Sequence, residues 1–279
     1  MAIAGTPSCP LTCALATKNN RTHVLYRLCT MSSPFKPEAL AGKVAVVTGG
    51  GSGICFEITK QLLLHGCTAA IICGRRENFL LKAAKELGAI SNRVCLYKVC
   101  DVRDPSACKA VVEYAMSHFG RVDILINGAA GNFLAEAKSL TPKGFKTVMD
   151  IDTQGTFNMC HAVFPAMTNG ERGGSIINIS MTLHYGATWY QAHASAAKSA
   201  IDSLTRSLAL EWGCHKIRVN GSEYIYSKHT LISCGKIAEQ VHAHLSTVFF
   251  STKLHRGLLQ ILLAQPNWLR ASLPMMSLR

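Results

Sequence analysis

The stretch VAVVTGGGSGIC, from Val44 to Cys55, decides the fold of this chain. Its first five residues are small or β-branched, which is typical of a buried strand, and the glycine-rich turn leads into a helical pattern. Glycines in such a turn let the backbone approach a pyrophosphate, while the helix N-terminus supplies unpaired N–H groups and a partial positive charge. The turn predicts a nucleotide phosphate site, to which we assign Gly49, Gly51, Ser52, Gly53 and Ile54.

Downstream of the turn, apolar strand-like runs alternate with helical patterns. The strand-like runs cover residues 44–48, 69–73, 94–99, 122–127, 175–180 and 217–220, and the helical patterns cover 57–65, 78–87, 107–119, 145–166 and 195–212. This alternation predicts an α/β fold, a doubly wound parallel sheet of the Rossmann type with helices on both faces.

Composition limits the classes of function. The 279 residues suit one α/β domain, and a net charge of +13 suits small anionic ligands such as phosphorylated cofactors. No element has base-reading spacing, so we expect no nucleic acid partner. The twelve cysteines show no zinc-site spacing, and we expect reduced interior thiols and no metal. No apolar run reaches the roughly 20 residues that span a bilayer.

The regular alternation ends at Gly221, and this gives a division into three parts. Residues 1–32 hold basic residues and no acid before Met31, and we expect a disordered extension or a transit-like segment. Residues 33–221 form the predicted nucleotide-binding domain. Residues 222–279 are a divergent tail, with a short helical subdomain over residues 254–269 as the alternative.

Two basic residues follow the second predicted strand, in the sequence Gly74-Arg75-Arg76. An NAD enzyme would place an acid there for the ribose hydroxyls, whereas guanidinium groups match a phosphate, so the pair predicts NADPH. The alternative is a pair of solvated arginines. After the third strand, Asp101 and Val102 are placed to contact an adenine, although Asp101 is equally suited to cap the next turn.

Several motifs together resemble the short-chain dehydrogenase/reductase family. They are TGGGSGI at 48–54, DV at 101–102, DILINGAAG at 123–131, INIS at 177–180 and a lysine, Lys198, on the following helix. AAGNF at 129–133, MDIDTQGTFN at 149–158 and HASAAK at 193–198 are similar to plant-like peroxisomal 2,4-dienoyl-CoA reductases. The resemblance covers about residues 33–220. It implies reduction of a 2,4-dienoyl-CoA to a 3-enoyl-CoA by NADPH, in the β-oxidation of unsaturated fatty acids.

The resemblance also implies catalytic roles. Lys198 has Ala194 one helical turn before it where a tyrosine is usual, so the proton needs another route. Lys198 would hold the nicotinamide ribose and contribute positive charge. Asp152 would handle the proton, or only position Lys198. Ser180 would donate to the thioester oxygen, or only cap a strand; Tyr185 and Tyr190 lack the one-turn spacing to Lys198.

Further contacts follow from the same resemblance. Asn127 and Ala129 would lie beside the cofactor, with Asn127 also structural. Asn132 and Phe133 would line the acyl-CoA pocket, and His193 would bind substrate or satisfy a loop carbonyl. The helical patterns near 147–166 and 195–212 would form a homo-oligomer interface.

The chain departs from the family pattern at two places. Cys55 replaces the third glycine of the fingerprint. After Gly221 the Pro-Gly segment, the substrate-covering loop and a last strand are not recognisable, so we expect a sheet without its last strand and reduced or absent activity. The alternatives are another short-chain carbonyl or enoyl reductase, or a non-catalytic nucleotide-binding product. We expect a peroxisomal location by resemblance, with mitochondrion or plastid as alternatives, because Ser277-Leu278-Arg279 is not a Ser-Lys-Leu address.

Overall fold

The computed structural model describes residues 15–18, 21–24, 33, 35–169, 172–182 and 188–224. Its contacts divide the chain into two units, Met1–Pro34 and Phe35–Arg279. In the first unit, β1 (Leu15–Lys18) and β2 (Arg21–Val24) pair as an antiparallel hairpin that the sequence pattern does not predict. The rest of the predicted extension, the predicted helical subdomain at 254–269 and the tail beyond residue 224 lie outside the described residues.

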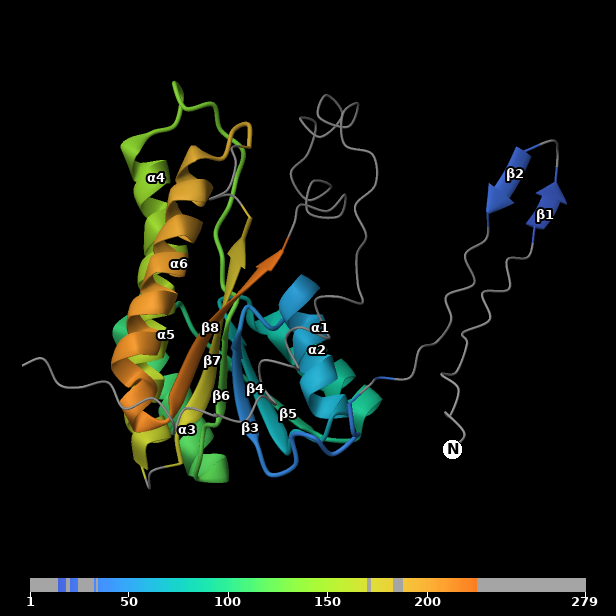
Figure 1. Cartoon of the computed structure of the whole chain (residues 1–279), viewed down its shortest axis with the longest axis vertical. Coiled ribbons are helices and arrows are strands. Elements are labelled where there is room, and N and C mark those ends of the chain that lie inside the picture. The colour runs from blue at the N-terminus through green and yellow to red at the C-terminus, as the bar shows by residue number, and fades with distance from the viewer. Residues whose placement is uncertain are drawn as a thin grey trace, which may run out of the picture. The chain divides into compact units, whose positions relative to one another are not determined.

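The second unit is built on a six-stranded sheet whose described pairings are all parallel. The order β5-β4-β3-β6-β7-β8 starts at β3 and grows outward in both directions, which confirms the predicted doubly wound fold (Figure 1). The strands are β3 (Val44–Thr48), β4 (Ala69–Gly74), β5 (Val94–Val99), β6 (Ile124–Asn127), β7 (Gly174–Met181) and β8 (Ile217–Tyr224).

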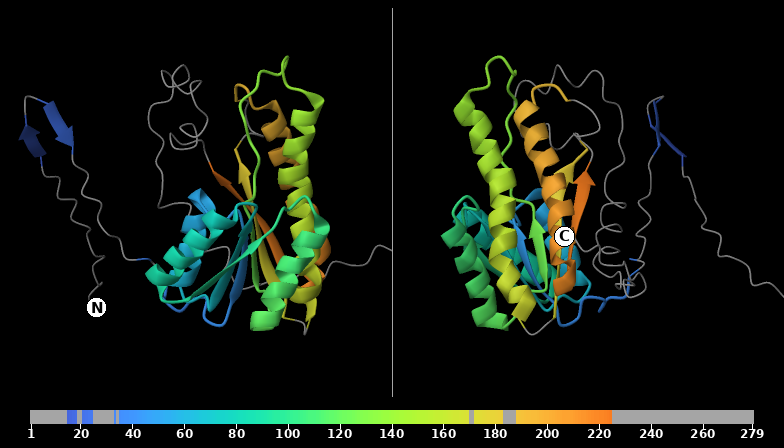
Figure 2. Two further views of the ribbon diagram at one scale, coloured as in Figure 1. Left: turned by 180° about the vertical axis from the view of Figure 1, so that it is seen from behind. Right: turned by 60° about the vertical axis from the view of Figure 1, so that its left-hand side comes forward.

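Helices cover both faces of this sheet (Figure 2). One apolar cluster packs α1 (Gly53–Leu64) and α2 (Glu77–Ser91) against Ala45 and Val47, and the other packs α3 (Pro105–Phe119), α5 (Gly155–Thr168) and α6 (Ala192–Trp212) against Val44 and Val46. The strand side chains alternate between the two clusters, as the pleat requires. No described helix has the length and apolar character to cross a bilayer.

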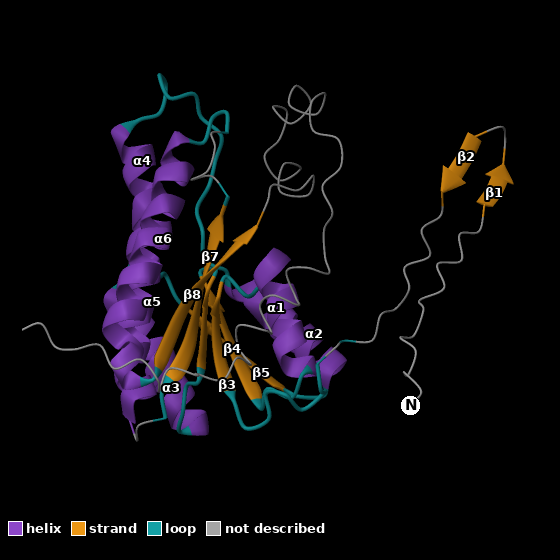
Figure 3. Cartoon of the chain, viewed as in Figure 1, coloured by secondary structure: helices purple, strands orange, loops and turns teal. Residues whose placement is uncertain are grey.

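The predicted helix over 145–166 consists of three segments, two of which are labelled α4 and α5 in Figure 3. They are α4 (Pro142–Met149), a π-helical turn η1 (Asp150–Gln154) and α5. Thr141 caps the start of α4 by accepting a hydrogen bond from the Gly144 N–H. π-helical turns inside α-helices often occur at functional sites, and this one contains Asp152.

The last described strand is longer than expected. The predicted strand 217–220 is too short, because β8 pairs with β7 as far as the register Met181 with Tyr224. β8 follows α6 after a 3-10 turn, η3 (Gly213–His215). Among residues 35–169, 172–182 and 188–224, no strand pairs with the outer edge of β8. Within that part of the chain, β8 is therefore an edge strand.

Candidate active site

A cleft of about 310 Å³ opens at the carboxyl ends of the central strands. This is the edge where open α/β sheets bind ligands. The predicted site residues that line the cleft are Gly49, Gly51, Ser52, Ile54, Arg75, Arg76, Asp101, Val102, Ala129 and Lys198. Segments far apart in the sequence therefore meet at the place that the glycine-rich turn indicates.

Two turns in close contact, one at Gly49 and one at Gly128, form the floor of the cleft. Gly49 has a φ of 71°, and a Cβ at this position would lie 2.9 Å from the carbonyl oxygen of Gly128. The Thr48 hydroxyl oxygen accepts hydrogen bonds from the N–H groups of Gly128 and Ala129, both at 2.9 Å. The Ser52 side chain does not cap α1, which leaves its first N–H groups to an anion in the cleft.

Arg75 and Arg76 supply positive charge where β4 ends. The Arg76 guanidinium stacks over the Phe79 ring, 4.2 Å from its centroid, which fixes its orientation. Neither arginine forms an ion pair within the described residues, and both line the cleft. Two guanidinium groups free of carboxylates suit a phosphate ligand.

Asp101 is engaged by a neighbouring side chain. Arg103 donates hydrogen bonds to both of its carboxylate oxygens, and these bonds lower the pKa of Asp101. Asp101 also caps the turn that follows it, as the sequence allows, because its Oδ1 accepts from the Arg103 N–H at 3.1 Å. The start of α3 is capped by Asp104, which accepts from the Ser106 N–H at 2.8 Å. Asp101 therefore lies on the cleft wall as one half of a surface ion pair.

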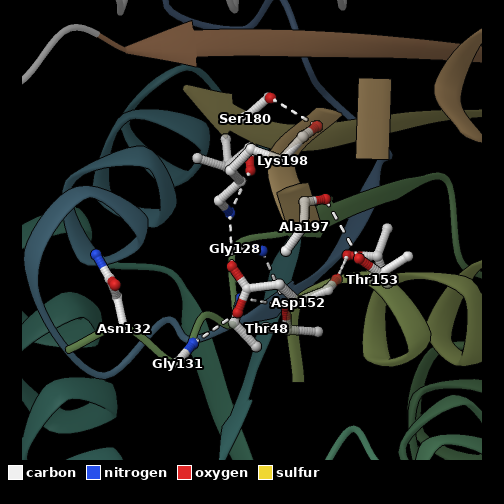
Figure 4. A network of polar contacts seen from close by, with 12 residues as sticks. Thr48, Gly128, Gly131, Asn132, Asp152, Thr153, Ser180, Ala197 and Lys198 are labelled. Atoms are coloured by element: carbon white, nitrogen blue, oxygen red, sulfur yellow. Dashed lines mark hydrogen bonds and ion pairs between the residues drawn. The ribbon is translucent and has the colours of Figure 1, made fainter. Parts of the chain in front are cut away.

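Asp152 and Lys198 form a buried ion pair beside the cleft (Figure 4). The Lys198 Nζ lies 3.2 Å from Asp152 Oδ2 and donates to the Ile179 carbonyl oxygen at 3.0 Å. Asp152 Oδ1 accepts from the Gly131 N–H at 2.7 Å. An ammonium group has three donors, so one N–H of Lys198 remains for a ligand in the cleft that this lysine lines.

The π-helical turn holds Asp152 against α6. The Thr153 hydroxyl donates to the Ala197 carbonyl oxygen at 3.2 Å, and the Thr156 hydroxyl donates to the Asp152 carbonyl oxygen at 2.6 Å. Ala197 directly precedes Lys198, so the turn and the lysine are fixed relative to each other. The carboxylate is therefore held in place before any ligand arrives.

Ser180 lies away from the cleft lining. It is fully buried, and its hydroxyl lies 3.5 Å from the Lys198 carbonyl oxygen, a long hydrogen bond. Its neighbour Ile179 lines the cleft instead. Ala194 is buried one turn before Lys198, and Tyr190 precedes α6 with a φ of 63°. Tyr185 lies outside the described residues.

Two further predicted cofactor residues are outside the cleft lining. Asn127 is buried, and its amide donates to Asn178 Oδ1 at 2.9 Å and to Cys160 Sγ at 3.2 Å. Asn178 donates in turn to the Thr205 hydroxyl at 2.9 Å, so this network ties β6 and β7 to α6. Gly53 is the first residue of α1, with a φ of 61°.

The residues predicted to bind substrate join the loop after β6 to the start of α6. Asn132 Nδ2 donates to Gln191 Oε1 at 2.9 Å, and the Phe133 ring packs on the His193 ring with centroids 4.5 Å apart. His193 is buried, and neither ring nitrogen has a well-formed hydrogen bond within the described residues. Burial lowers the pKa of His193, while the Phe133 main chain and the Asp152 carboxylate oppose that effect.

Gln191 is a site residue that the sequence analysis missed. It is a buried polar side chain just before α6, and it contacts Asn132 directly. The sequence signal that could have indicated Gln191 is its position two residues before His193, directly before the helix that supplies Lys198.

The family model of the short chain dehydrogenases matches residues 43–228. The chain belongs to the short-chain dehydrogenase family. A peroxisomal 2,4-dienoyl-CoA reductase of Arabidopsis thaliana is 53% identical over 199 residues, which cover 68% of this chain and 66% of that protein. The enzyme of the same name from Danio rerio is 48% identical over 186 residues, covering 67% and 61%. The chain thus matches somewhat less than two thirds of the length of these relatives.

A solved structure agrees with this short-chain dehydrogenase fold. The citronellol catabolism dehydrogenase of Pseudomonas aeruginosa PAO1 superposes with a TM-score of 0.70 at 27% identity, covering 82% of this chain and 91% of that one. The family membership and the cleft together identify a nucleotide-binding fold.

The short-chain dehydrogenase fingerprint is altered here at Cys55, and the structure shows how the change is accommodated. A Cβ at Gly128 would lie 2.0 Å from Cys55 Sγ, so the sulfur occupies space that a side chain at Gly128 would need. Cys55 is buried, and burial raises the pKa of its thiol to about 12. This cysteine is a packing residue.

Proposed function

We propose that this chain is an NADPH-dependent reductase that converts a 2,4-dienoyl-CoA into a 3-enoyl-CoA. The observation that carries the proposal is the buried Asp152–Lys198 pair at a nucleotide cleft, with Ala194 where a phenol would stand. A tyrosine one turn before the lysine serves proton delivery to a carbonyl oxygen. Where that tyrosine is absent, the Asp152 carboxylate suits a reaction in which the proton is delivered to a carbon atom.

The cleft residues fit NADPH. The Gly49 and Gly128 turns pack against each other and against Cys55 with no room for a Cβ, which keeps the cleft floor to backbone, and the uncapped start of α1 would face the pyrophosphate. Arg75 and Arg76 would hold the ribose 2′-phosphate, with Arg76 pre-oriented by Phe79. Asp101, Val102 and Ala129 would form the adenine and ribose walls, and Lys198 would hold the nicotinamide ribose.

The bound cofactor would supply a hydride to the far end of the conjugated diene. Negative charge then spreads to the thioester oxygen, and donors at that oxygen lower the barrier. Lys198, held by Asp152 and the Ile179 carbonyl, contributes fixed positive charge close to this position. Asp152 handles the proton that reaches the α-carbon, directly or through water. Asn132, Phe133 and His193 border the acyl chain.

Similarity to named relatives supports the biological setting. The Arabidopsis and Danio relatives are named as peroxisomal enzymes that produce (3E)-enoyl-CoA. We therefore infer an acyl-CoA substrate, a role in β-oxidation and a peroxisomal location. The exposed Phe157 on α5 and Leu210 on α6 support an apolar contact between copies, as a homo-oligomer requires.

The proposal is tested with purified protein, NADPH and 2,4-hexadienoyl-CoA, by following NADPH absorbance and identifying the product. We expect NADPH oxidation that depends on 2,4-hexadienoyl-CoA and yields a 3-enoyl product. Because the matched relatives are longer, the same assay is run on a chimera that carries a relative's C-terminal third. Absence of turnover in both proteins, each shown to be folded and to bind NADPH, rejects the proposal.

A second candidate function is nucleotide binding without turnover. It is favoured by the open edge of β8 within the described residues, next to a complete cofactor cleft. NADPH titration by fluorescence separates the two. A folded native chain that binds NADPH, and gains turnover only as the chimera, is a binding protein in its present form.

A further inference from the structure

A buried asparagine on α5 is bonded to the wall of the cleft. Asn158 is 6% exposed, and its Nδ2 donates to the Val102 carbonyl oxygen at 2.8 Å. Val102 lies in the loop between β5 and α3 and lines the cleft, whereas Asn158 does not. A side chain that lies outside the cleft therefore holds part of the cleft wall in place.

The orientation of the Asn158 amide is fixed from both sides. A carbonyl oxygen only accepts, so the NH₂ group of Asn158 must face Val102. Gln154 Nε2 donates to Asn158 Oδ1 at 2.9 Å, so the donor and the acceptor of this amide both have partners. Within the described part of the chain, the Val102 carbonyl otherwise accepts only from the Cys108 thiol, a weak donor whose sulfur is 3.5 Å away. Loss of the Asn158 donor would leave this buried carbonyl poorly paired, which favours a change in the loop.

The same helix packs directly on the Val102 side chain at a glycine. A Cβ at Gly155 would clash with Val102 Cγ2 and would lie 2.9 Å from Val102 Cβ. The bare backbone of Gly155 therefore allows the wall to lie against the helix. Gly155 and Asn158 are three positions apart, the spacing that puts residues on one helix face. Together they hold both the side chain and the main chain of Val102.

The preceding turn of this helical run holds the proposed catalytic pair (Figure 4). The π-helical turn η1 leads into α5 without a break, and within it Asp152 pairs with Lys198. The Thr153 hydroxyl donates to the Ala197 carbonyl oxygen at 3.2 Å. Lys198 lines the cleft beside β7, whereas Val102 lines it after β5, on the other side of the central strand β3. One continuous helical run therefore contacts two distant walls of the cleft.

We propose that Asn158 is a positioning residue of the nucleotide site. It holds the Val102 wall so that the adenine end of a bound dinucleotide lies in register with the Asp152–Lys198 pair at the reactive end. Asn158 acts through Val102 and does not contact the nucleotide itself. Gly155 provides the close approach that the same wall requires. This inference rests on the proposed nucleotide site and extends it to two residues outside the cleft lining.

The first test is Asn158→Asp in the full chain. An ionised carboxylate has nearly the shape of the amide and still accepts from Gln154, but it cannot donate to Val102. The dissociation constant of NADPH, measured by calorimetric titration, should rise at least about tenfold. Adenosine 2′,5′-bisphosphate, the adenine end of NADPH, should lose affinity by the same factor. Unchanged binding of both ligands, or a loss for NADPH alone, overturns the proposal.

The pH dependence of this variant separates the lost donor from general damage. Burial raises the pKa of a carboxylic acid, and the protonated acid has an O–H that can donate to the Val102 carbonyl. The affinity of Asn158→Asp for adenosine 2′,5′-bisphosphate, relative to the wild type, should therefore recover as the pH falls from 8 to 5.5. A variant that is as weak relative to the wild type at pH 5.5 as at pH 8 contradicts the role of the donor.

Gly155→Ala tests the same wall and leaves the Asn158 amide intact. The added Cβ would displace Val102, so both ligands should bind at least about tenfold more weakly. Unchanged binding in this variant overturns the role of the helix contact.

The matched control is Asn178→Asp. Asn178 is a buried asparagine that donates to the Thr205 hydroxyl at 2.9 Å and does not line the cleft. This variant should bind both ligands within about twofold of the wild type, and circular dichroism confirms that all variants are folded. A loss as large as that of Asn158→Asp would mean that any such buried substitution loosens the site, which overturns the proposal.

Failure of the proposed function gives a different result. A wild-type protein that binds NADH and not NADPH contradicts the proposed cofactor, and the positioning role is then decided by the same variants with NADH and adenosine 5′-monophosphate. A wild-type protein that binds none of these nucleotides overturns both proposals. A wild-type protein that binds NADPH, with equal binding in Asn158→Asp, overturns the positioning role alone.

Discussion

The two halves of the sheet hold their site residues in different ways. In the half formed by β3, β4 and β5, the proposed cofactor residues follow the strand ends directly, and the backbone shapes the cleft. In the half formed by β6, β7 and β8, the proposed catalytic groups are side chains from different helical segments, fixed by the Asp152–Lys198 ion pair. The first half depends on close backbone packing at Gly49 together with two arginine side chains at the end of β4, and the second depends on charges that compensate each other.

This difference has energetic consequences. A side chain added at a glycine turn introduces strain, whereas removing one member of a buried ion pair leaves a charge without compensation. Changes in the first half should mainly reduce stability and nucleotide affinity. Changes in the second half should mainly reduce turnover.

The largest effect is expected for Asp152→Asn. Asn keeps an oxygen that can accept from the Gly131 N–H but removes the carboxylate that we propose handles the proton, so kcat should fall about 10²- to 10⁴-fold. The NADPH dissociation constant should change much less. Steady-state kinetics with 2,4-hexadienoyl-CoA, on the native chain or on the chimera if only that is active, measures both quantities.

The matched control is Asp150→Asn in the same π-helical turn. Asp150 pairs with Lys146 on the surface and lies away from the cleft lining, so its loss should change kcat less than about threefold. Equal losses in the two variants would show that the turn matters and the Asp152 carboxylate does not.

The next largest effect is expected for Gly128→Ala. The new Cβ would lie 2.0 Å from Cys55 Sγ, and overpacking of this kind costs about 1–3 kcal/mol in the free energy of unfolding. In a Cys55→Gly background the clash is relieved, so the double-mutant cycle should show a coupling of about 1 kcal/mol or more. Urea unfolding of the four proteins measures it.

Gly213→Ala is the control for that cycle. Gly213 has a φ of −57°, and no atom lies within 4 Å of a Cβ added there. The free energy of unfolding of Gly213→Ala should therefore differ from that of the wild type by less than about 1 kcal/mol. Additive effects of Cys55→Gly and Gly128→Ala would refute the packing explanation for Cys55.

A smaller effect, confined to the half formed by β3, β4 and β5, is expected for the double variant Arg75→Ala with Arg76→Ala. Loss of two phosphate-matching guanidinium groups should weaken NADPH binding about 10- to 100-fold and leave NADH binding nearly unchanged. Fluorescence titration with both nucleotides measures the preference. Lys82→Ala, an exposed charge on α2, controls for net charge. Equal weakening of both nucleotides would mean that the arginines only add positive charge.

The same contrast explains what the sequence could predict. The strands, the parallel doubly wound character of the sheet and the glycine-rich turn follow from the sequence pattern, because strands, helices and turns are encoded in neighbouring residues. The contact of Asp152 with Lys198 was expected only through resemblance, because periodicity does not bring residues of different helices together. The cleft-lining residues assigned from motifs remain proposals for ligand contact.

Other features could not be read from the pattern. The π-helical turn at Asp150–Gln154 has no residue signature of its own, so the sequence pattern indicates a single helix. The strand end at Tyr224 depends on pairing with β7 and not on local composition. Ser180 follows Ile179 on a strand whose side chains alternate, so Ile179 lines the cleft while Ser180 points to the other side.

The smallest effect is expected for His193, whose burial should make the folded protein less stable in acid. Burial lowers the pKa of folded His193, so below the unfolded value of about 6.5 the unfolded chain binds the proton more readily. Stability from the neutral ring is present above that pH and is lost as the pH falls. Between pH 7.5 and 5.5 the wild type should therefore lose more stability than His193→Gln, by roughly 1 kcal/mol.

Thermal unfolding of both proteins across this range measures the difference, with exposed His118→Gln as the control. A difference that stays constant with pH, or that grows as the pH rises, would mean that the Phe133–His193 contact is packing alone.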